Sequence, residues 1–260
     1  MKRTICVVLS LFVLTSGIFA AEGATIVIGV SPFPHKEIAR VAKAVLEKEG
    51  YSLEIKDFTD YVTPNIALEE KSLDANFFQH APYLENTVRE KGFDLSWVVK
   101  VHIEPLGLYS KKIRALGELK QGDIVAIPND PTNGARALRL LEKNGLIRVR
   151  AGDLVTAGDI TENPKSLRIV ELDAPQLPRS LDDTTASVIN TNFAVEAKLI
   201  PSRDAIVIED GESPYANVVA VRTADRDSPA VQALTRAFNS PEVKRFIETE
   251  LVPKGIVAAF

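Results

Sequence analysis

Cysteine is almost absent from this chain. Cys6 is the only cysteine among 260 residues, and it lies in an apolar stretch near the N-terminus. A mature chain without this stretch would have no disulfide, no thiolate nucleophile and no cysteine ligand for a metal. Lipid attachment requires a cysteine directly after a small-residue box at the end of the apolar region, and Cys6 comes too early for that. The sequence therefore predicts no lipid anchor.

The chain also lacks long blocks of like charge and has few long apolar runs. The 31 basic and 35 acidic residues are interspersed and leave a formal charge of −4. Because no basic block or stripe is present, we expect no nucleic-acid partner.

One apolar run stands at the N-terminus. The basic start MKRT is followed by ICVVLSLFVLTSGIFA, which is the order of a secretory signal peptide. We therefore expect residues 1–20 to be a signal peptide that is cleaved after Ala20. An uncleaved membrane anchor is the alternative, although the run is short for a bilayer span of about 20 residues.

Familiar catalytic motifs are missing as well. The chain has no G-x-S-x-G elbow, no phosphate-binding loop and no G-x-G-x-x-G. Its three histidines, His35, His80 and His102, are far apart and form no H-E-x-x-H pair, so we predict no metal site and no cofactor. A Ser-His-Asp triad assembled from distant residues stays open, but we predict no catalytic residues and no enzyme activity.

The residues that are present alternate between strand and helix patterns. Apolar residues make up 45% and charged residues 25% of the chain, which predicts a packed core. Strands are expected at 24–31, 52–58 and 73–78, with helices at 35–50 and 63–72 between them. Thr63 is the expected N-cap of the second helix. This βαβαβ series predicts a parallel sheet.

A second series of the same kind follows. A strand at 122–130 leads into a helix at 131–145, which Asp130 is expected to cap. Further strands are expected at 166–173 and 184–190. Helices at 228–240 and 240–251 each begin with Ser-Pro. Two such series predict two α/β lobes.

Ligands of open α/β sheets bind outside the carboxyl ends of the strands. That rule selects five short segments that each follow an expected strand. In order along the chain they are SPFPH, FTDY, FFQH, PNDPTN and the Ile-Asn that follows TTASV.

Arg136 lies close to one of these segments, about a turn and a half into the helix that begins at Pro131. A helix N-terminus attracts an anion, and a guanidinium can hold a carboxylate with two parallel hydrogen bonds. Arg136 is therefore a candidate ligand for a carboxylate. A solvated helix residue is the alternative interpretation.

Two asparagines also lie at strand ends. Asn190 ends the apolar stretch ASVIN, and Asn217 precedes another apolar stretch in SPYANVVAV. Because an asparagine side chain both donates and accepts, such a pair can bind the ammonium and carboxylate groups of an amino acid. A turn residue is an equally good interpretation of Asn190.

The segment FFQH places aromatic rings and a histidine at a third strand end. Phe77 and Phe78 must point to opposite faces of a strand, so one faces the core and the other the crevice. Tyr61 could join the crevice-facing ring in an apolar wall that suits a thioether, because sulfur packs favourably on aromatic edges. The alternatives are a structural role for His80 and a core role for the aromatic residues.

Several long blocks of this sequence occur in an order that resembles a known family. They are FTDYVTPNIALEEKSLDANFFQHAPYL, VHIEPLGLYSKKI, IPNDPTNGARALRLLEKNGLI, QLPRSLDD, VINTNFA and ESPYANV. The chain is similar, from about residue 25 to 260, to the MetQ/NlpA family of methionine-binding proteins. These are the extracytoplasmic receptors of a methionine ABC importer.

The resemblance implies an α/β protein with the two-lobed type II periplasmic-binding fold and the ligand in the interlobe cleft. Residues 25–106 and 220–260 would form the first lobe and residues 107–219 the second. The protein would be a periplasmic monomer that delivers L- or D-methionine to a permease and its ATPase at the inner membrane.

The resemblance also implies roles for six residues. Arg136 would hold the ligand carboxylate, while Asn190 and Asn217 would hydrogen-bond its amino and carboxylate groups. His80 would be a further polar contact, and Tyr61 and Phe78 would line the thioether side chain. Phe77 would then belong to the core.

One feature departs from the family pattern. Many members are lipoproteins, whereas this chain lacks the lipid-modification box, so a free periplasmic receptor is expected. Two alternatives to a methionine receptor stay open. One is a receptor for another small amino acid or organic anion on the same fold, and the other is a periplasmic hydrolase.

Overall fold

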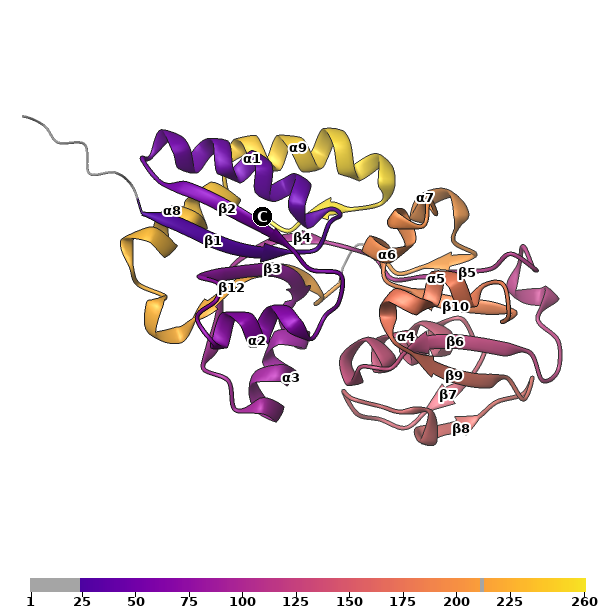
Figure 1. The fold of residues 1–260 in the computed structure, drawn as a ribbon. Coiled ribbons are helices and arrows are strands. Elements are labelled where there is room, and N and C mark those ends of the chain that lie inside the picture. Colours follow the sequence, from indigo (N-terminus) through magenta and orange to yellow (C-terminus); the bar gives the residue numbers. More distant parts are fainter. Residues whose placement is uncertain (1–23, 211–212) are drawn as a thin grey trace, which may run out of the picture.

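Two separate β-sheets organise the chain. The computed structural model describes residues 24–210 and 213–260; the expected signal peptide, Cys6 and the cleavage site at Ala20 lie outside these residues. Figure 1 shows the two sheets side by side, each with its own helices. This is the two-lobed α/β architecture that the resemblance predicts.

The first sheet has six strands and the second has five. The order in the first is β13 (Val257–Ala258), β4 (Leu95–Ile103), β12 (Ala216–Arg222), β3 (Ala75–His80), β1 (Thr25–Val30) and β2 (Ser52–Asp57). The order in the second is β11 (Val207–Ile208), β5 (Gly107–Tyr109), β10 (Ala186–Ile189), β6 (Ile124–Pro128) and β9 (Arg168–Leu172). A two-stranded ribbon, β7 (Arg148–Val149) with β8 (Ile160–Glu162), accompanies the second sheet.

The two sheets share one topology. In each, the strands of a βαβαβ series pair in parallel, with β1 between β2 and β3 and with β6 between β9 and β10. An antiparallel strand is then added beside the last of them, β12 next to β3 and β5 next to β10. Each added strand follows a connection from the other sheet, so the chain passes twice between the lobes.

The helices cover both faces of each sheet. In the first lobe they are α1 (His35–Lys48), α2 (Thr63–Glu69), α3 (Ala81–Lys91), α8 (Pro229–Phe238) and α9 (Pro241–Phe246); in the second they are α4 (Pro131–Lys143), α5 (Leu177–Ser180), α6 (Thr191–Glu196) and α7 (Pro201–Asp204). Helices α1, α8 and α9 bury their apolar residues against one face of the first sheet, and α2 and α3 cover the other. The C-terminal helices thus return to the first lobe, as expected.

Three helix starts follow the predicted local chemistry. The side chain of Asp130 accepts a hydrogen bond from the Asn133 backbone and caps α4, and Ser228 and Ser240 cap α8 and α9 in the same way. The prediction of Thr63 as the N-cap of α2 is wrong. Thr63 is already helical, and Asp60 accepts from its backbone N–H at 2.7 Å.

The chain crosses from the first sheet to the second after β4 and returns before β12. Strands up to Ile103 and from Ala216 onward belong to the first sheet, and strands from Gly107 to Ile208 belong to the second. Residues 216–219, which were expected at the end of the second lobe, therefore form part of β12. Within residues 24–210 and 213–260, the helices are too short or too polar to span a bilayer.

Phe77 tests the packing of the first lobe. Its side chain is fully buried and meets the ring of Phe238 edge-on, with 5.1 Å between the centroids. Phe77→Ala should lower the free energy of unfolding by about 3–5 kcal/mol, because it leaves a cavity in a close-packed core. Urea denaturation measures this, with Phe93→Ala at a half-buried position as the control. Equal losses for the two variants would contradict the account.

Candidate functional site

A small cavity lies between the two lobes, at the carboxyl ends of their parallel strands. All five strand-end segments selected from the sequence contribute side chains to its wall. The six predicted site residues all line it: Tyr61, Phe78, His80, Arg136, Asn190 and Asn217.

One side of the cavity is an aromatic wall. The ring of Tyr61 lies 6.0 Å from that of Phe78, 6.0 Å from that of Tyr83 and 5.1 Å from that of Phe193, measured between centroids. Phe78 faces this wall, whereas the neighbouring Phe77 packs in the core. Strand alternation therefore separates the two rings as the sequence predicts. Tyr83 and Phe193 were not predicted.

Asn133 is a polar centre that the sequence reasoning missed. Its side-chain oxygen accepts a hydrogen bond from Asn190 Nδ2 at 2.9 Å and lies 3.1 Å from His80 Nε2. His80 Nδ1 in turn accepts from the Tyr83 backbone and so caps α3. These bonds require a neutral His80 that donates through Nε2. Asn133 lies in the PNDPTN segment, and its position one turn into α4 was the available signal.

Arg136 is almost fully buried, with 3% of its surface exposed. Its Nε and Nη2 donate to the two carboxylate oxygens of Glu209 at 2.8 and 2.5 Å, and Nη2 also donates to the backbone oxygen of Glu104. The guanidinium stacks over the ring of Tyr215 at 4.2 Å. Because the bonds with described residues use Nε and Nη2, Nη1 is the donor left for a ligand. The partner Glu209 was not predicted.

Two buried amide atoms on the cavity wall have no hydrogen-bond partner among the described residues. They are the acceptor Asn190 Oδ1 and the donor Asn192 Nδ2, on residues that are 7% and 2% exposed. Burying an amide group without a partner costs free energy. A donor and an acceptor on one wall suit a ligand that both accepts and donates.

Hydrogen bonds also cross the cavity from one lobe to the other. The hydroxyl of Tyr61 donates to Asn192 Oδ1 at 2.6 Å, and His80 contacts Asn133. Tyr61 follows strand β2 and His80 ends strand β3, both in the first sheet. Their partners Asn192 and Asn133 lie in the first turns of α6 and α4 in the second lobe. The structure therefore has its lobes in contact around the site.

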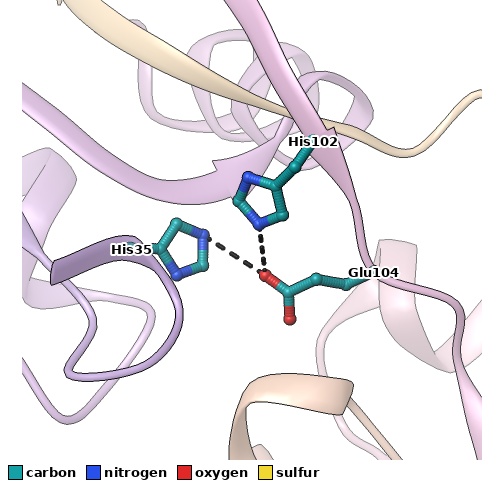
Figure 2. A group of neighbouring side chains, drawn as sticks. All are labelled: His35, His102 and Glu104. Atoms are coloured by element: carbon teal, nitrogen blue, oxygen red, sulfur yellow. Dashed lines mark hydrogen bonds and ion pairs between the residues drawn. The ribbon is translucent and has the colours of Figure 1, made fainter. Parts of the chain in front are cut away.

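On the remaining wall, Glu104 lies between two histidines that are far apart in the sequence. Figure 2 shows His35 and His102 turned toward one carboxylate oxygen of Glu104. Their Nε2 atoms lie 3.5 and 2.8 Å from that oxygen, and His35 Nε2 lies 3.1 Å from Asn217 Oδ1. The two imidazoles are close in space although they are far apart in sequence. Sequence reasoning missed this convergence and missed Glu104.

These three groups could in principle hold a metal, since their ligand atoms lie within 4.8 Å of one another. The surroundings do not favour it. Histidines that bind metals usually donate their other ring N–H to an acceptor, whereas Nδ1 of His35 and of His102 has no partner among the described residues. Three ligands are also one short of a structural zinc site. The cluster is better described as a hydrogen-bonded carboxylate.

Burial controls the protonation of the site. It lowers the pKa of His35 to about 4 and the pKa values of His80 and His102 to about 3. Burial raises the pKa of Glu104, although His35 and Arg136 counter this effect. It also raises the pKa of Tyr61, with the charge of Glu104 as the second cause. All three histidines are therefore neutral at pH 7.

Known proteins resemble this chain over most of its length. The sequence model of the NlpA lipoprotein family matches residues 26–260. The D-methionine-binding lipoprotein MetQ of Escherichia coli (strain K12) is 46% identical over 221 residues, which cover 83% of this chain and 82% of that protein.

Solved structures agree with the fold. A nutrient-binding protein from Burkholderia cenocepacia bound to methionine superimposes with a TM-score of 0.87 at 47% identity, over 90% of this chain and all of that chain. A periplasmic substrate-binding protein of an ABC transporter from Coxiella burnetii gives a TM-score of 0.86 at 46% identity, over the same shares.

The buried histidines predict an acid-sensitive fold. Their pKa values are lower in the folded protein than in the unfolded chain, so below pH 6.5 the unfolded state binds more protons. Each histidine should lower the free energy of unfolding by about 1.4 kcal/mol per pH unit in this range. The raised pKa of Glu104 acts in the opposite direction.

Urea denaturation between pH 7 and pH 5 measures this dependence, in a window above the usual titration of carboxylates. His80→Gln removes one titrating group and should give a shallower pH dependence, whatever its effect on absolute stability. Stability that stays constant or rises toward pH 5 would contradict the assignment of neutral histidines.

Proposed function

Because this chain belongs to the NlpA lipoprotein family, we propose that it is an extracytoplasmic substrate-binding protein that captures methionine and delivers it to an ABC transporter. The relatives named above bind methionine or serve such a transporter. The similarity extends over nearly the whole described chain, including every segment that lines the cavity.

The observation that carries this proposal is the division of the cavity into an apolar and a polar side. The rings of Tyr61 and Phe78 form one wall, and the buried guanidinium and amides of Arg136, Asn190 and Asn192 form another. A methionine has the matching parts, since its thioether packs well on aromatic rings and its carboxylate suits a guanidinium.

The roles of the individual residues follow from their free hydrogen-bonding atoms. Arg136 would bind the ligand carboxylate through Nη1, because its other donors already contact Glu209 and Glu104. Asn192 Nδ2 is a second donor for that carboxylate, and Asn190 Oδ1 is an acceptor for the amino group. His80 and Asn217 would complete the polar side.

Transport would require the two lobes to open and close. We place the first lobe at residues 25–106 and 220–260 and the second at 107–219, although residues 216–219 belong to strand β12 of the first sheet. A ligand that contacts both lobes stabilises the closed form by hinge motion. The closed protein, a monomer, would then dock on the permease and ATPase of the importer. We propose a periplasmic location, since the relative from Coxiella burnetii is a periplasmic substrate-binding protein.

No catalytic role is part of this proposal. The histidine side chains hydrogen-bond to Asn217, Asn133 and Glu104, and among the described residues no serine hydroxyl is hydrogen-bonded to a histidine. This arrangement argues against a serine hydrolase triad. A receptor for another small amino acid is the second candidate, because the apolar wall would also accept other unbranched or aromatic side chains.

Calorimetry with a panel of amino acids tests the proposal directly. Purified protein, unfolded and refolded to remove any retained ligand, should bind L- or D-methionine more tightly than any other amino acid in the panel. Mass spectrometry of material released by the first unfolding step should detect intact methionine. Preferential binding of a different amino acid would contradict the assignment of methionine as the substrate. Release of a chemically altered ligand would contradict the proposal that the protein has no catalytic role.

Arg136→Ala should weaken methionine binding by roughly 30-fold to several thousand-fold, because it removes the buried partner of a carboxylate. Arg139→Ala is the matched control. Arg139 lies one turn further along α4 and hydrogen-bonds to Glu142 and to the Arg150 backbone, away from the cavity. Calorimetry of both variants measures the difference. Unchanged binding by the Arg136 variant, or an equal loss in the control, would refute the assignment.

A further inference from the structure

Tyr215 covers one side of the Arg136 guanidinium. Its ring centroid lies 4.2 Å from Arg136 Cζ, and the ring also meets that of His80 edge-on, with 5.0 Å between the two centroids. The face of an aromatic ring attracts a guanidinium, and the attraction is stronger where water is excluded. Tyr215 therefore contacts two residues that line the ligand cavity.

Tyr215 itself lies outside that cavity. The described residues that line the cavity do not include it. It borders two surface grooves instead, one beside Lys143 of α4 and one between α3 and α4. Arg136 lines both the first of these grooves and the cavity. The ring of Tyr215 and the guanidinium of Arg136 therefore form the partition between the cavity and the solvent in that groove.

The contact between these two side chains crosses from one lobe to the other. Tyr215 directly precedes β12 of the first sheet, and β12 pairs with β3, which ends at His80. Arg136 belongs to α4, which packs in the core of the second lobe. Opening of the lobes would therefore withdraw the ring from Arg136, while its contact with His80 stays within the first lobe. Arg136 is covered by the ring only when the lobes are closed.

We propose that Tyr215 is a lid over Arg136, which seals the guanidinium from solvent when the lobes close and so slows the release of the ligand. This inference rests on the proposed function, in which Arg136 binds the ligand carboxylate. Exclusion of water strengthens the attraction between a guanidinium and a carboxylate, because the local dielectric constant falls. Both contacts of Tyr215 use its ring, so the hydroxyl group is not required.

Tyr215→Ala should weaken methionine binding by roughly 3-fold to 30-fold, which corresponds to the loss of a cation–π contact. Most of this loss should lie in the dissociation rate, as is usual for variants of one binding site. Release of isotope-labelled methionine into an excess of unlabelled methionine measures that rate. Tyr215→Phe keeps the ring and should behave like the wild-type protein. Pro214→Ala, at the exposed neighbouring position, is the matched control and should also leave binding unchanged.

The dependence of binding on salt distinguishes a lid from a residue that only stabilises the fold. Calorimetry with methionine at low and high sodium chloride should show little change in the affinity of the wild-type protein, because a buried ion pair is screened weakly. In Tyr215→Ala the affinity should fall as the salt concentration rises, because solvent and ions then reach Arg136. A variant that only destabilised the fold would lose the same factor at both salt concentrations.

Four results would overturn the inference. Tyr215→Ala could release methionine at the wild-type rate, or lose affinity by a factor that does not depend on salt. Tyr215→Phe could lose as much affinity as Tyr215→Ala. The wild-type protein could itself show a strong salt dependence, and this last test needs no variant to fold. A wild-type protein that does not bind methionine at all would instead overturn the proposed function.

Discussion

The pairing of Arg136 with Glu209 is the interaction on which the site depends. It fixes the guanidinium with two parallel bonds, and the backbone N–H of Leu106 donates to the same carboxylate at 3.0 Å. Arg136 also donates to the backbone oxygen of Glu104. One ion pair therefore joins helix α4 to both connections between the sheets. A buried arginine is stable here because its charge is neutralised and most of its donors are used.

This arrangement separates two electrostatic tasks. Glu209 neutralises Arg136 and still leaves Nη1 as a donor for a carboxylate, whereas Glu104 lies beside the neutral His102, and burial raises its pKa. Donors for a carboxylate, Arg136 and Asn192, lie in the second lobe. Acceptors for an amino group lie in both lobes, with Asn190 Oδ1 after β10 of the second sheet and Asn217 Oδ1 in β12 of the first. A zwitterion would therefore bridge the lobes, and this differential contact is what a ligand needs to favour closure.

The sequence predicted those parts of the molecule that depend on local rules. Helix starts at Asp130 and Ser228 follow from side-chain capping and the adjacent proline. Strand alternation explains why Phe77 packs in the core while Phe78 lines the cavity. The strand-end rule selected the segments that line the cavity, because the carboxyl ends of parallel strands meet at one edge. Resemblance to a known family then selected particular side chains within those segments.

Other features could not be read from neighbouring residues. The proximity of His35 to His102 depends on the order of strands in the first sheet, where β12 separates β3 from β4 by long-range pairing. The contact between Arg136 and Glu209 spans 73 positions. Helix α3 and strand β4 were not predicted, since α3 buries few apolar residues and β4 pairs only with strands from the end of the chain. Thr63 failed as a cap because it is already the first helical residue, and the side chain of Asp60 accepts from the backbone N–H groups of Val62 and Thr63 instead.

A crystal structure of the protein with methionine would test the central claim most directly. The account predicts a ligand enclosed between the lobes, with its carboxylate on Arg136 and Asn192 and its amino group on Asn190 and Asn217. Its thioether should lie against the rings of Tyr61 and Phe78. Methionine bound outside this cavity, or bound with its carboxylate away from Arg136, would contradict the account.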